Sequence, residues 1–306
     1  MQWIRDHQPD PKRDQAYKKA LIITLAGNIF LAVGKGLVSY LTGSAALYAD
    51  TANSVSDVIY SLAMVFGIWY AIQPPDLSHP QGHSRFEPLV GLVVSIMMAI
   101  AGYEAIRTSI ARFISGAEAI QINLPTIILL ISAAIKTGMF FIIRKMAVAT
   151  DSPSLRVTAK DNLSDVLTSL AAFFGILGSS FIHPLLDPAA GVLVSLWIFK
   201  AVYGAVKENL KYLTGAGADE DLRQRIIQTA NGIEGVHNVH HMMSDYVGPK
   251  LIVDMHINLP GHASLDEVHE ISDRVIDALQ ALPEVDRAYV HVEPFEGEND
   301  QLIMNN

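Results

Sequence analysis

The chain has 306 residues, of which 50% are hydrophobic and only 17% charged, and its formal net charge is −9. Together with a positive mean hydropathy, this composition is unusual for a soluble protein of this length and predicts a membrane protein, with no nucleic-acid partner. The chain has no cysteine, which excludes disulfides and thiolate metal sites, disfavours copper(I), and leaves imidazole, carboxylate, amide and backbone oxygen as metal ligands.

The first residues are mixed and charged, and they lack the apolar core and cleavage site of a signal peptide. Beyond them, apolar stretches of about 20 residues predict membrane-spanning helices. These stretches fall near residues 20–41, 45–72, 88–113, 123–143, 157–182 and 187–212. Lysine and arginine gather before the first helix, between the second and third, and between the fourth and fifth. By the positive-inside rule, both ends of the chain are expected in the cytoplasm.

A polar motif recurs in the second and fifth predicted helices: Asn-Ser-Val-Ser-Asp-Val begins at Asn53, and Asp-Asn-Leu-Ser-Asp-Val begins at Asp161. In each copy a second oxygen-bearing side chain follows four residues later, Asp57 or Asp165, which places both oxygens on one helix face. With six spans the two helices run in opposite directions, as in inverted repeats that bind substrate at their interface. Hydrogen bonding between helices would explain Asn53 but not three acids, because acids within spans are costly and mark functional sites. Asn53, Asp57, Asp161 and Asp165 therefore predict a cation site.

The predicted ligands of this site are all hard oxygens. Such a set suits manganese, iron(II) or magnesium better than tetrahedral zinc. Clustered carboxylates also repel one another, so they take up protons readily and release them when a dication enters. The sequence therefore favours an exchange of metal for protons.

A loop between the second and third helices holds Asp76, His79 and His83 in the spacing D-x-x-H-x-x-x-H. It could supply three metal ligands, or it could be a polar loop that happens to hold two histidines. Two lysines, Lys35 and Lys136, fall within spans, where a lysine must reach the interface or pair with an acid. Lys136 is too far from its helix ends to reach the interface easily. Its expected role is either to offset the acidic site or to form a structural hydrogen bond.

After residue 213 the character of the sequence changes. Residues 214–306 hold 17 of the 31 acidic residues but only 5 of the 22 lysines and arginines. We therefore expect a transmembrane domain over 1–213 and a cytoplasmic C-terminal domain over 214–306. Its pattern predicts a helix from 219, strands at 236–244 and 250–259 joined by a turn at 246–249, a helix at 265–282, and a strand at 288–293. Ser264 and Glu267 form a capping box at the start of the second helix.

The C-terminal domain also carries seven of the eleven histidines. One histidine on a strand edge is usually only a polar surface residue. Here His240 and His256 lie on neighbouring predicted strands, and His269, His291 and Glu293 lie elsewhere in the same small domain. This density favours a second metal-binding region.

At these residues the chain resembles the cation diffusion facilitator family of divalent-metal/proton antiporters. The resemblance extends over residues 20–295, and it includes the paired motifs, the D-x-x-H-x-x-x-H-x-R-x-E loop, Leu-Asp-Pro at 186–188, and the α-β-β-α-β order of the tail. It implies a homodimer in the lipid bilayer, with a membrane α-helical bundle of six transmembrane helices and an α+β, ferredoxin-like, metallochaperone-like cytoplasmic domain. The resemblance also implies the site residues: Asn53, Asp57, Asp161 and Asp165 for transport, Asp76, His79 and His83 in the loop, and His240, His256, His269, His291 and Glu293 in the tail.

Zinc-transporting members usually place a histidine in the transport quartet, whereas this chain has asparagine followed by three aspartates, which resembles the manganese-exporting branch. We therefore expect proton-coupled export of Mn2+ from the cytoplasm across an inner or plasma membrane, with divalent metal ions as substrate and as regulatory ligand. Export of Zn2+ or Fe2+ is the alternative within the family. A passive metal channel and a membrane-anchored metal sensor are alternatives of another class. An enzyme is not expected, because no nucleophile or general-base pair stands beside the acids.

Overall fold

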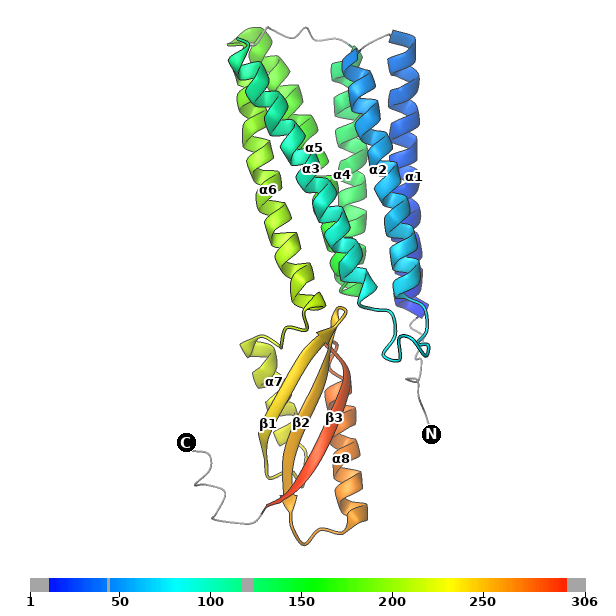
Figure 1. Ribbon diagram of the computed structural model, residues 1–306, viewed down its shortest axis with the longest axis vertical. Coiled ribbons are helices and arrows are strands. Elements are labelled where there is room, and N and C mark those ends of the chain that lie inside the picture. The colour runs from blue at the N-terminus through cyan, green and yellow to red at the C-terminus, as the bar shows by residue number, and fades with distance from the viewer. Residues whose placement is uncertain (1–10, 43–44, 117–123, 296–306) are drawn as a thin grey trace. The chain divides into compact units, whose positions relative to one another are not determined.

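The computed structural model describes residues 11–42, 45–116 and 124–295 (Figure 1). The chain divides into two compact units, Met1–Leu210 and Lys211–Asn306. The helices of the first unit are α1 (Pro11–Thr42), α2 (Ala45–Ala71), α3 (Phe86–Ile114), α4 (Leu124–Thr150), α5 (Pro153–Phe181) and α6 (Leu186–Leu213), whose last residues belong to the second unit. The second unit continues with α7 (Glu220–Asn231), β1 (Asn238–Val247), β2 (Lys250–Pro260), α8 (Leu265–Gln280) and β3 (Val285–Phe295).

The first unit is a bundle of long helices that alternate in direction, so that α2 and α5 run opposite ways (Figure 1). Among the described residues, α1, α2, α3, α4 and α6 each contain a segment long and apolar enough to cross a membrane. Helix α5 has a comparable length of 29 residues but a more polar composition. Its polar side chains are buried in the bundle, where Thr158 and Asn162 are at most 1% exposed. A membrane bundle of six helices, as predicted, accommodates α5 because its polar face meets protein and not lipid.

Helix α5 begins earlier than its apolar run indicates, at Pro153 and not near 157. The hydroxyl of Ser152 caps the helix by accepting a hydrogen bond from the backbone N–H of Leu155 over 3.1 Å, and proline at the first turn lacks a donor that would otherwise need a partner. The added turn carries Arg156, which pairs with Asp151 and Glu208. A criterion based on hydropathy alone omits this turn because it is charged.

A buried carboxylate joins three helices at one end of the bundle. Glu87, in the first turn of α3, is 2% exposed. It accepts a hydrogen bond from Tyr17 of α1 over 2.8 Å, and it also accepts hydrogen bonds from the hydroxyls of Ser152 and Ser154 at the start of α5. Hydrogen bonding of this kind is what allows a carboxylate to remain buried.

Helices α3 and α6 approach each other closely at glycines. A β-carbon added to Gly91 would lie 2.3 Å from the side-chain oxygen of Asn209, and one added to Gly191 would lie 2.1 Å from the hydroxyl of Ser109. At Gly102 an added β-carbon would lie 3.0 Å from Ile198. Small residues at such positions let helices in a membrane pack at close range.

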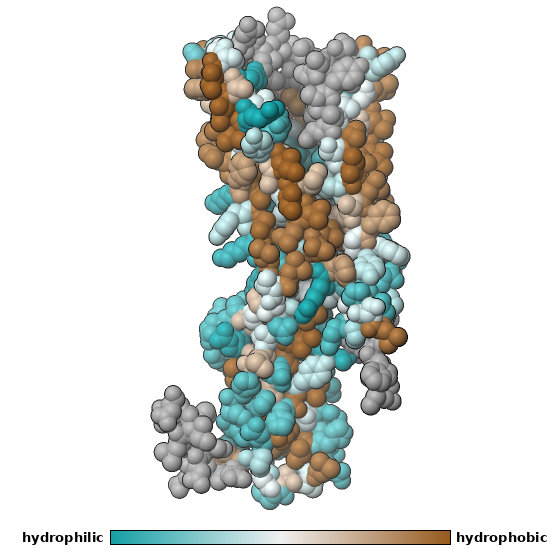
Figure 2. Space-filling model, in the orientation of Figure 1, coloured by the Kyte–Doolittle hydropathy of each residue, from teal (hydrophilic) through white to brown (hydrophobic). Residues whose placement is uncertain are grey.

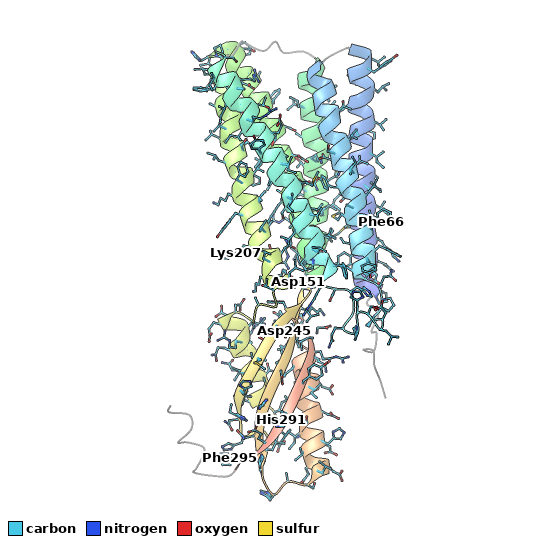
Figure 3. The ribbon with its side chains drawn as sticks, in the orientation of Figure 1. Phe66, Asp151, Lys207, Asp245, His291 and Phe295 are labelled. Carbon is cyan, nitrogen blue, oxygen red and sulfur yellow. The ribbon has the colours of Figure 1, made fainter. Side chains whose placement is uncertain are left out.

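Hydrophobic side chains dominate the surface of the bundle, whereas hydrophilic ones dominate the second unit (Figure 2). Phe30, Phe66 and Val148, for example, are each at least 65% exposed, and Phe66 points away from the bundle (Figure 3). Apolar side chains on this scale are stable in contact with lipid but not with water. The exposed surface of the bundle is therefore the lipid-facing surface of an integral membrane protein.

The second unit is a three-stranded sheet covered on one face by α7 and α8. Strand β2 is central, antiparallel to β1 and parallel to β3. Its alternate residues Leu251, Val253, Met255 and Ile257 are fully buried against the two helices, and this alternation fixes the register. The predicted order α-β-β-α-β and the predicted capping box of Ser264 and Glu267 are both confirmed.

The hairpin between β1 and β2 is tighter than predicted. Strand β1 continues through Tyr246 to Val247, which pairs directly with Lys250. The chain therefore reverses over two residues, and the first of them, Gly248, has a φ of 71°. This left-handed conformation is open to glycine and is typical of two-residue hairpin loops. The loop therefore consists of residues 248 and 249 only, where the sequence predicted a turn over 246–249.

Candidate functional site

The acids of the repeated motif meet inside the bundle at a lysine from a third helix. Lys136 of α4 places its ammonium nitrogen 3.0 Å from Oδ2 of Asp57 on α2 and 2.6 Å from Oδ2 of Asp165 on α5. Lys136 and Asp57 are buried, at 4% and 9% exposure, while the Asp165 side chain is 27% exposed. Two acids that are distant in the sequence are thus brought to one point.

Asp161, one turn before Asp165, joins the same group through an aromatic residue. The hydroxyl of Tyr60 on α2 donates a hydrogen bond to Asp161 Oδ2, and both residues are buried. Tyr60 follows Asp57 by three residues, which places the two side chains on one face of α2. Tyr60 is a member of the site that the repeat does not reveal, because the matching position of the second copy is not aromatic.

The backbone of Asn53 lies in α2 one turn before Asp57, but its side chain lies outside the described part of the chain. Near Asp57 the helix is fixed by polar contacts. Ser61 donates to the carbonyl oxygen of Asp57 over 2.6 Å, and Asn28 of α1 donates to the hydroxyl of Ser61 over 2.8 Å. Such contacts orient α2 against α1 and hold the acidic face toward the interior.

A cavity of about 370 Å³ leads to these acids between α3, α5 and α6. Asp161 and Asp165 line it together with Ser164 and Thr168 from the same helix. On the opposite wall are polar residues of α3 and α6: Glu104, Thr108, Ser109, Arg112 and Asp187. The cavity is large enough for hydrated ions, and although most of its lining is apolar, these polar side chains suit a cation path to the acidic group.

An ion pair lies at the end of α3 and the start of α6, where Arg112 contacts Asp187. Asp187 is 9% exposed, and this contact compensates its burial. The apolar sequence around Arg112 gives no indication of this pairing. Arg107, one turn earlier, pairs instead with Glu104 over 2.7 Å, as the three-residue spacing predicts.

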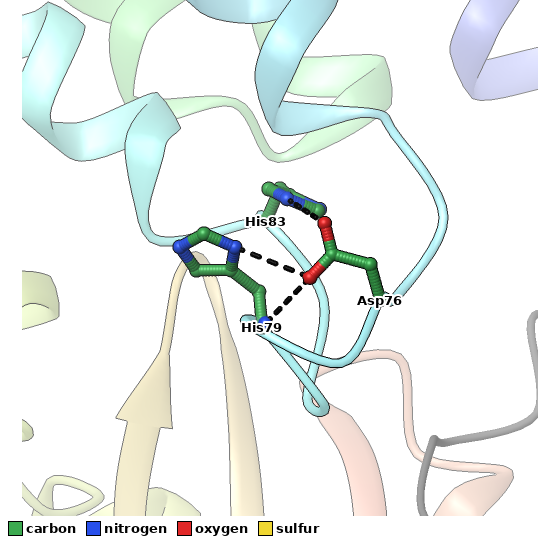
Figure 4. A group of neighbouring side chains, drawn as sticks. All are labelled: Asp76, His79 and His83. Carbon is green, nitrogen blue, oxygen red and sulfur yellow. Dashed lines mark hydrogen bonds and ion pairs between the residues drawn. The ribbon is translucent and has the colours of Figure 1, made fainter.

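The loop between α2 and α3 brings its three predicted ligands together (Figure 4). One ligand atom each from Asp76, His79 and His83 lies within 4.8 Å of the others. Asp76 Oδ1 is 3.4 Å from Nδ1 of His79, and Asp76 Oδ2 is 3.5 Å from Nε2 of His83. The ring of Tyr70 packs edge-on against His83 and Phe86, which positions the imidazoles.

The aspartate of this loop cluster is held ionised by its surroundings. The backbone N–H of His79 donates to Asp76 Oδ1 over 2.6 Å, and this hydrogen bond lowers the pKa of Asp76 below its ordinary value. Stabilisation of the charged form by a donor has this sign for a carboxyl group. A carboxylate with two neighbouring imidazoles, one of them buried, is a donor set that can hold a divalent cation.

In the second unit, His240, His256 and Glu293 bring their ligand atoms within 4.8 Å of one another. Glu293 is central: its carboxylate oxygens lie 3.2 Å from nitrogens of His240 and His256, and 3.8 Å from one of His291. These residues lie on the sheet face that α7 and α8 leave open, and Figure 3 labels His291 on β3. We refer to His240, His256, His291 and Glu293 as the tail cluster.

Two further histidines of the second unit lie outside the tail cluster. His269 is on α8, 75% exposed, and pairs with Asp273 one turn later, so the structure does not bring it to the tail cluster. His241 is exposed, and its ring lies 4.9 Å from that of His256. A β-bulge between Val239 and His241 turns successive residues to the same face, and strict alternation along the strand cannot anticipate this.

Comparison with known proteins covers both units. The model of the cation efflux transmembrane domain matches residues 21–214, and that of the cation efflux protein cytoplasmic domain matches residues 218–295. A similar protein is an uncharacterized transporter of Methanocaldococcus jannaschii, 34% identical, with the match covering 90% of this chain and 98% of that protein.

Two relatives with more specific names are also similar. The manganese efflux system protein MneS of Bacillus subtilis is 27% identical, covering 90% of this chain and 94% of that protein. The magnetosome protein MamM of Paramagnetospirillum magneticum is 31% identical, and the match covers 83% of this chain and 80% of that protein. Among solved structures, a copper form of the MamM C-terminal domain covers 26% of this chain and 90% of that chain, at 27% identity and a TM-score of 0.26.

Proposed function

Because the chain belongs to the cation diffusion facilitator family, whose members export metal ions and are not enzymes, we propose that it exports Mn2+ in exchange for protons. The observation that carries this proposal is the convergence of Asp57, Asp161 and Asp165 from two antiparallel helices inside a bundle. In the proposed site, these acids and Asn53 bind the metal. A group of acids buried this way requires a cation or protons for charge balance.

The donor set favours manganese because it offers only oxygens. Hard oxygen ligands bind Mn2+ well, whereas zinc sites generally include imidazole or thiolate. A relative of comparable length is named as a manganese efflux protein, which supports the same choice. Zinc or iron(II) is the second candidate, favoured by the imidazoles of the loop and tail clusters.

In the proposed cycle, metal enters from the cytoplasm and displaces protons from the acidic group. When the site opens to the opposite side of the membrane, protons from that side bind the carboxylates again and the metal is released there. The cavity between α3, α5 and α6, with polar side chains in its wall, would provide the route to Asp165 on one side. Alternating access of this kind requires that metal and protons compete for the same oxygens, as clustered carboxylates do.

Reconstituted transport tests the proposal. Proteoliposomes with an imposed pH gradient should accumulate Mn2+ against its own gradient, in preference to Zn2+, Fe2+ and Cd2+, and a protonophore should abolish the accumulation. Accumulation that survives the protonophore would contradict proton coupling. Equilibration without accumulation would identify a passive channel, and binding without flux would identify a sensor.

The choice of metal is tested by changing the single amide of the quartet. Replacing Asn53→His adds the imidazole that zinc sites favour, and Asn53→Asp adds a fourth carboxylate. Both variants should shift the ratio of Mn2+ to Zn2+ transport, the first of them toward Zn2+. An unchanged ratio in both would show that Asn53 does not set selectivity.

We further propose that the loop and tail clusters bind cytoplasmic metal and that metal in the tail brings two protomers together. In this view bound cations neutralise an acidic domain whose charge otherwise keeps two copies apart. Glu293→Ala removes the carboxylate that three histidines share, so metal affinity at the tail cluster should fall about 10- to 100-fold. Titration calorimetry of the full-length protein measures this loss.

His269→Ala is the matched control for that change, because His269 lies on α8 away from the cluster. It should leave tail binding unchanged. If Glu293→Ala and His269→Ala lost metal affinity to the same extent, the tail cluster would not be the metal site. A dimerisation equilibrium that is the same with and without metal would rule out the proposed regulatory step.

A further inference from the structure

Lys136 is a buried basic residue that contacts two acids of the transport site. It lies on the interior face of α4, in line with the buried residues Ala133, Met139 and Ile143, at the helical spacing of three and four. Its ammonium is therefore directed into the bundle, and the residue is only 4% exposed. A permanent charge in this position needs a compensating partner, and it has two.

The ammonium contacts the oxygens that a metal would use. Its nitrogen is 3.0 Å from Asp57 Oδ2 and 2.6 Å from Asp165 Oδ2, so it bridges α2 and α5, the two helices that supply the site. Divalent metals bind carboxylate oxygens at about 2.0 to 2.2 Å. A dication on the same oxygens would therefore lie within a few ångströms of a fixed positive charge, where repulsion in a low-dielectric interior is strong.

We propose that Lys136 is a tethered competitor of the transported metal: its ammonium and the dication bind Asp57 and Asp165 in turn. This inference rests on the proposed transport site. Lys136 is then a positioning residue that contacts the ligands and not the metal. Metal can enter only as the lysine side chain withdraws, and the returning ammonium helps to expel the metal, so the affinity stays low enough for release.

The geometry favours this role over that of a simple counter-ion. The ammonium rests on oxygens from both of the helices that supply the proposed metal ligands, so it occupies the position that a bound dication would need. Here the shorter of the two contacts is to Asp165, which also lines the cavity, and the other is to Asp57 on the opposite helix. The lysine side chain has four rotatable bonds, so the same ammonium can leave both oxygens without movement of the helix.

Equilibrium binding to the full-length protein in lipid nanodiscs tests the competition. The loop and tail clusters are first disabled by Asp76→Ala, His256→Ala and Glu293→Ala, so that the remaining site is the one in the bundle. In this background Lys136→Met should tighten the apparent Kd for Mn2+ about tenfold or more, because the competing charge is gone. Lys136→Arg keeps the charge and should not tighten binding. Lys200→Met removes a lysine from the exposed surface of α6 and should change nothing.

Two further variants guard against a folding defect. Lys136→Gln keeps hydrogen-bond donors near both acids without the charge, and it should also tighten binding. Lys136→Cys introduces the only thiol of the chain, so treatment with bromoethylamine restores an ammonium at that position alone. Binding should be tight before this treatment and return to the wild-type affinity after it, whereas alkylation with a neutral reagent should not restore it.

The outcomes separate this inference from the proposed function. If the protein that lacks the loop and tail clusters but keeps Lys136 binds no Mn2+, the proposed choice of metal fails. The same comparison of Lys136 variants is then made with Cd2+ or Zn2+. If affinity is unchanged or weaker in Lys136→Met and in Lys136→Gln for the metal that the wild type does bind, the competition does not exist. If aminoethylation leaves the affinity of the cysteine variant unaltered, the ammonium is not the competing group.

Discussion

Asp57→Asn is expected to reduce Mn2+ transport by about a hundredfold or more. Even residues that only orient a metal ligand cost 10- to 100-fold when removed, so loss of a ligand should lie at or beyond the upper end of that range. The substitution keeps the shape of the side chain but removes its charge. It also removes one of the two carboxylates that hold Lys136. Initial rates of Mn2+ uptake into proteoliposomes, at equal protein density, measure the effect.

Asp151→Asn is the matched control for this change. Asp151 lies between α4 and α5 at one end of the bundle, labelled in Figure 3, and its side chain is 57% exposed. Its φ of 51° is a conformation that asparagine adopts as readily as aspartate. Uptake should therefore stay near the wild-type rate. If the two variants transport equally well, Asp57 is not a ligand.

Glu87→Ala is expected to destabilise the membrane unit by about 3 kcal/mol. It leaves the hydroxyls of Tyr17, Ser152 and Ser154 without this acceptor, and the first two are at most 1% exposed. Buried donors that lose a charged acceptor cost about 1 to 3 kcal/mol each, offset in part by the removal of a buried carboxylate. The midpoint of thermal unfolding in detergent should fall accordingly.

Glu104→Ala provides the comparison at an exposed position of the same helix. Glu104 is 56% exposed and pairs with Arg107 one turn away. Exposed pairs of this type contribute at most about 1 kcal/mol, so the midpoint should hardly move. A similar shift in both variants would mean that Glu87 does not join α1, α3 and α5 in the way its contacts indicate.

The helices and the order of the tail could be predicted because they depend on local patterns. Long apolar runs indicate spans, and alternation on β2 fixes its buried face. Two features depend on single residues and were predicted less well. The charged first turn of α5 is stabilised by the cap at Ser152, and the hairpin is tightened by Gly248. Hydropathy averages over a window and cannot detect either effect.

Convergence of the acids could be inferred from the repeat, and offsetting the acidic site was one of the two roles expected of Lys136, but the particular acids that it contacts could not be predicted. That Lys136 approaches Asp57 and Asp165 depends on how α4 packs beside α5 and α1, which no spacing in the sequence encodes. Tyr60 could have been suggested by its position one turn after Asp57. The position of His241 beside His256 depends on a bulge in β1, and the shared domain of His269 and the tail ligands does not indicate that α8 holds His269 apart from them. Pairing across elements is set by tertiary packing.

The glycine contacts between α3 and α6 restrict how the membrane unit can rearrange. At Gly91 and Gly191 a partner side chain rests almost on the helix backbone, so sliding one helix past the other would force atoms into overlap. We therefore expect the two helices to move together where these contacts lie. If the pair moves together, a motion that changes access to Asp165 is expected where α3 and α6 face α5 across the cavity, and it would change the width of that cavity.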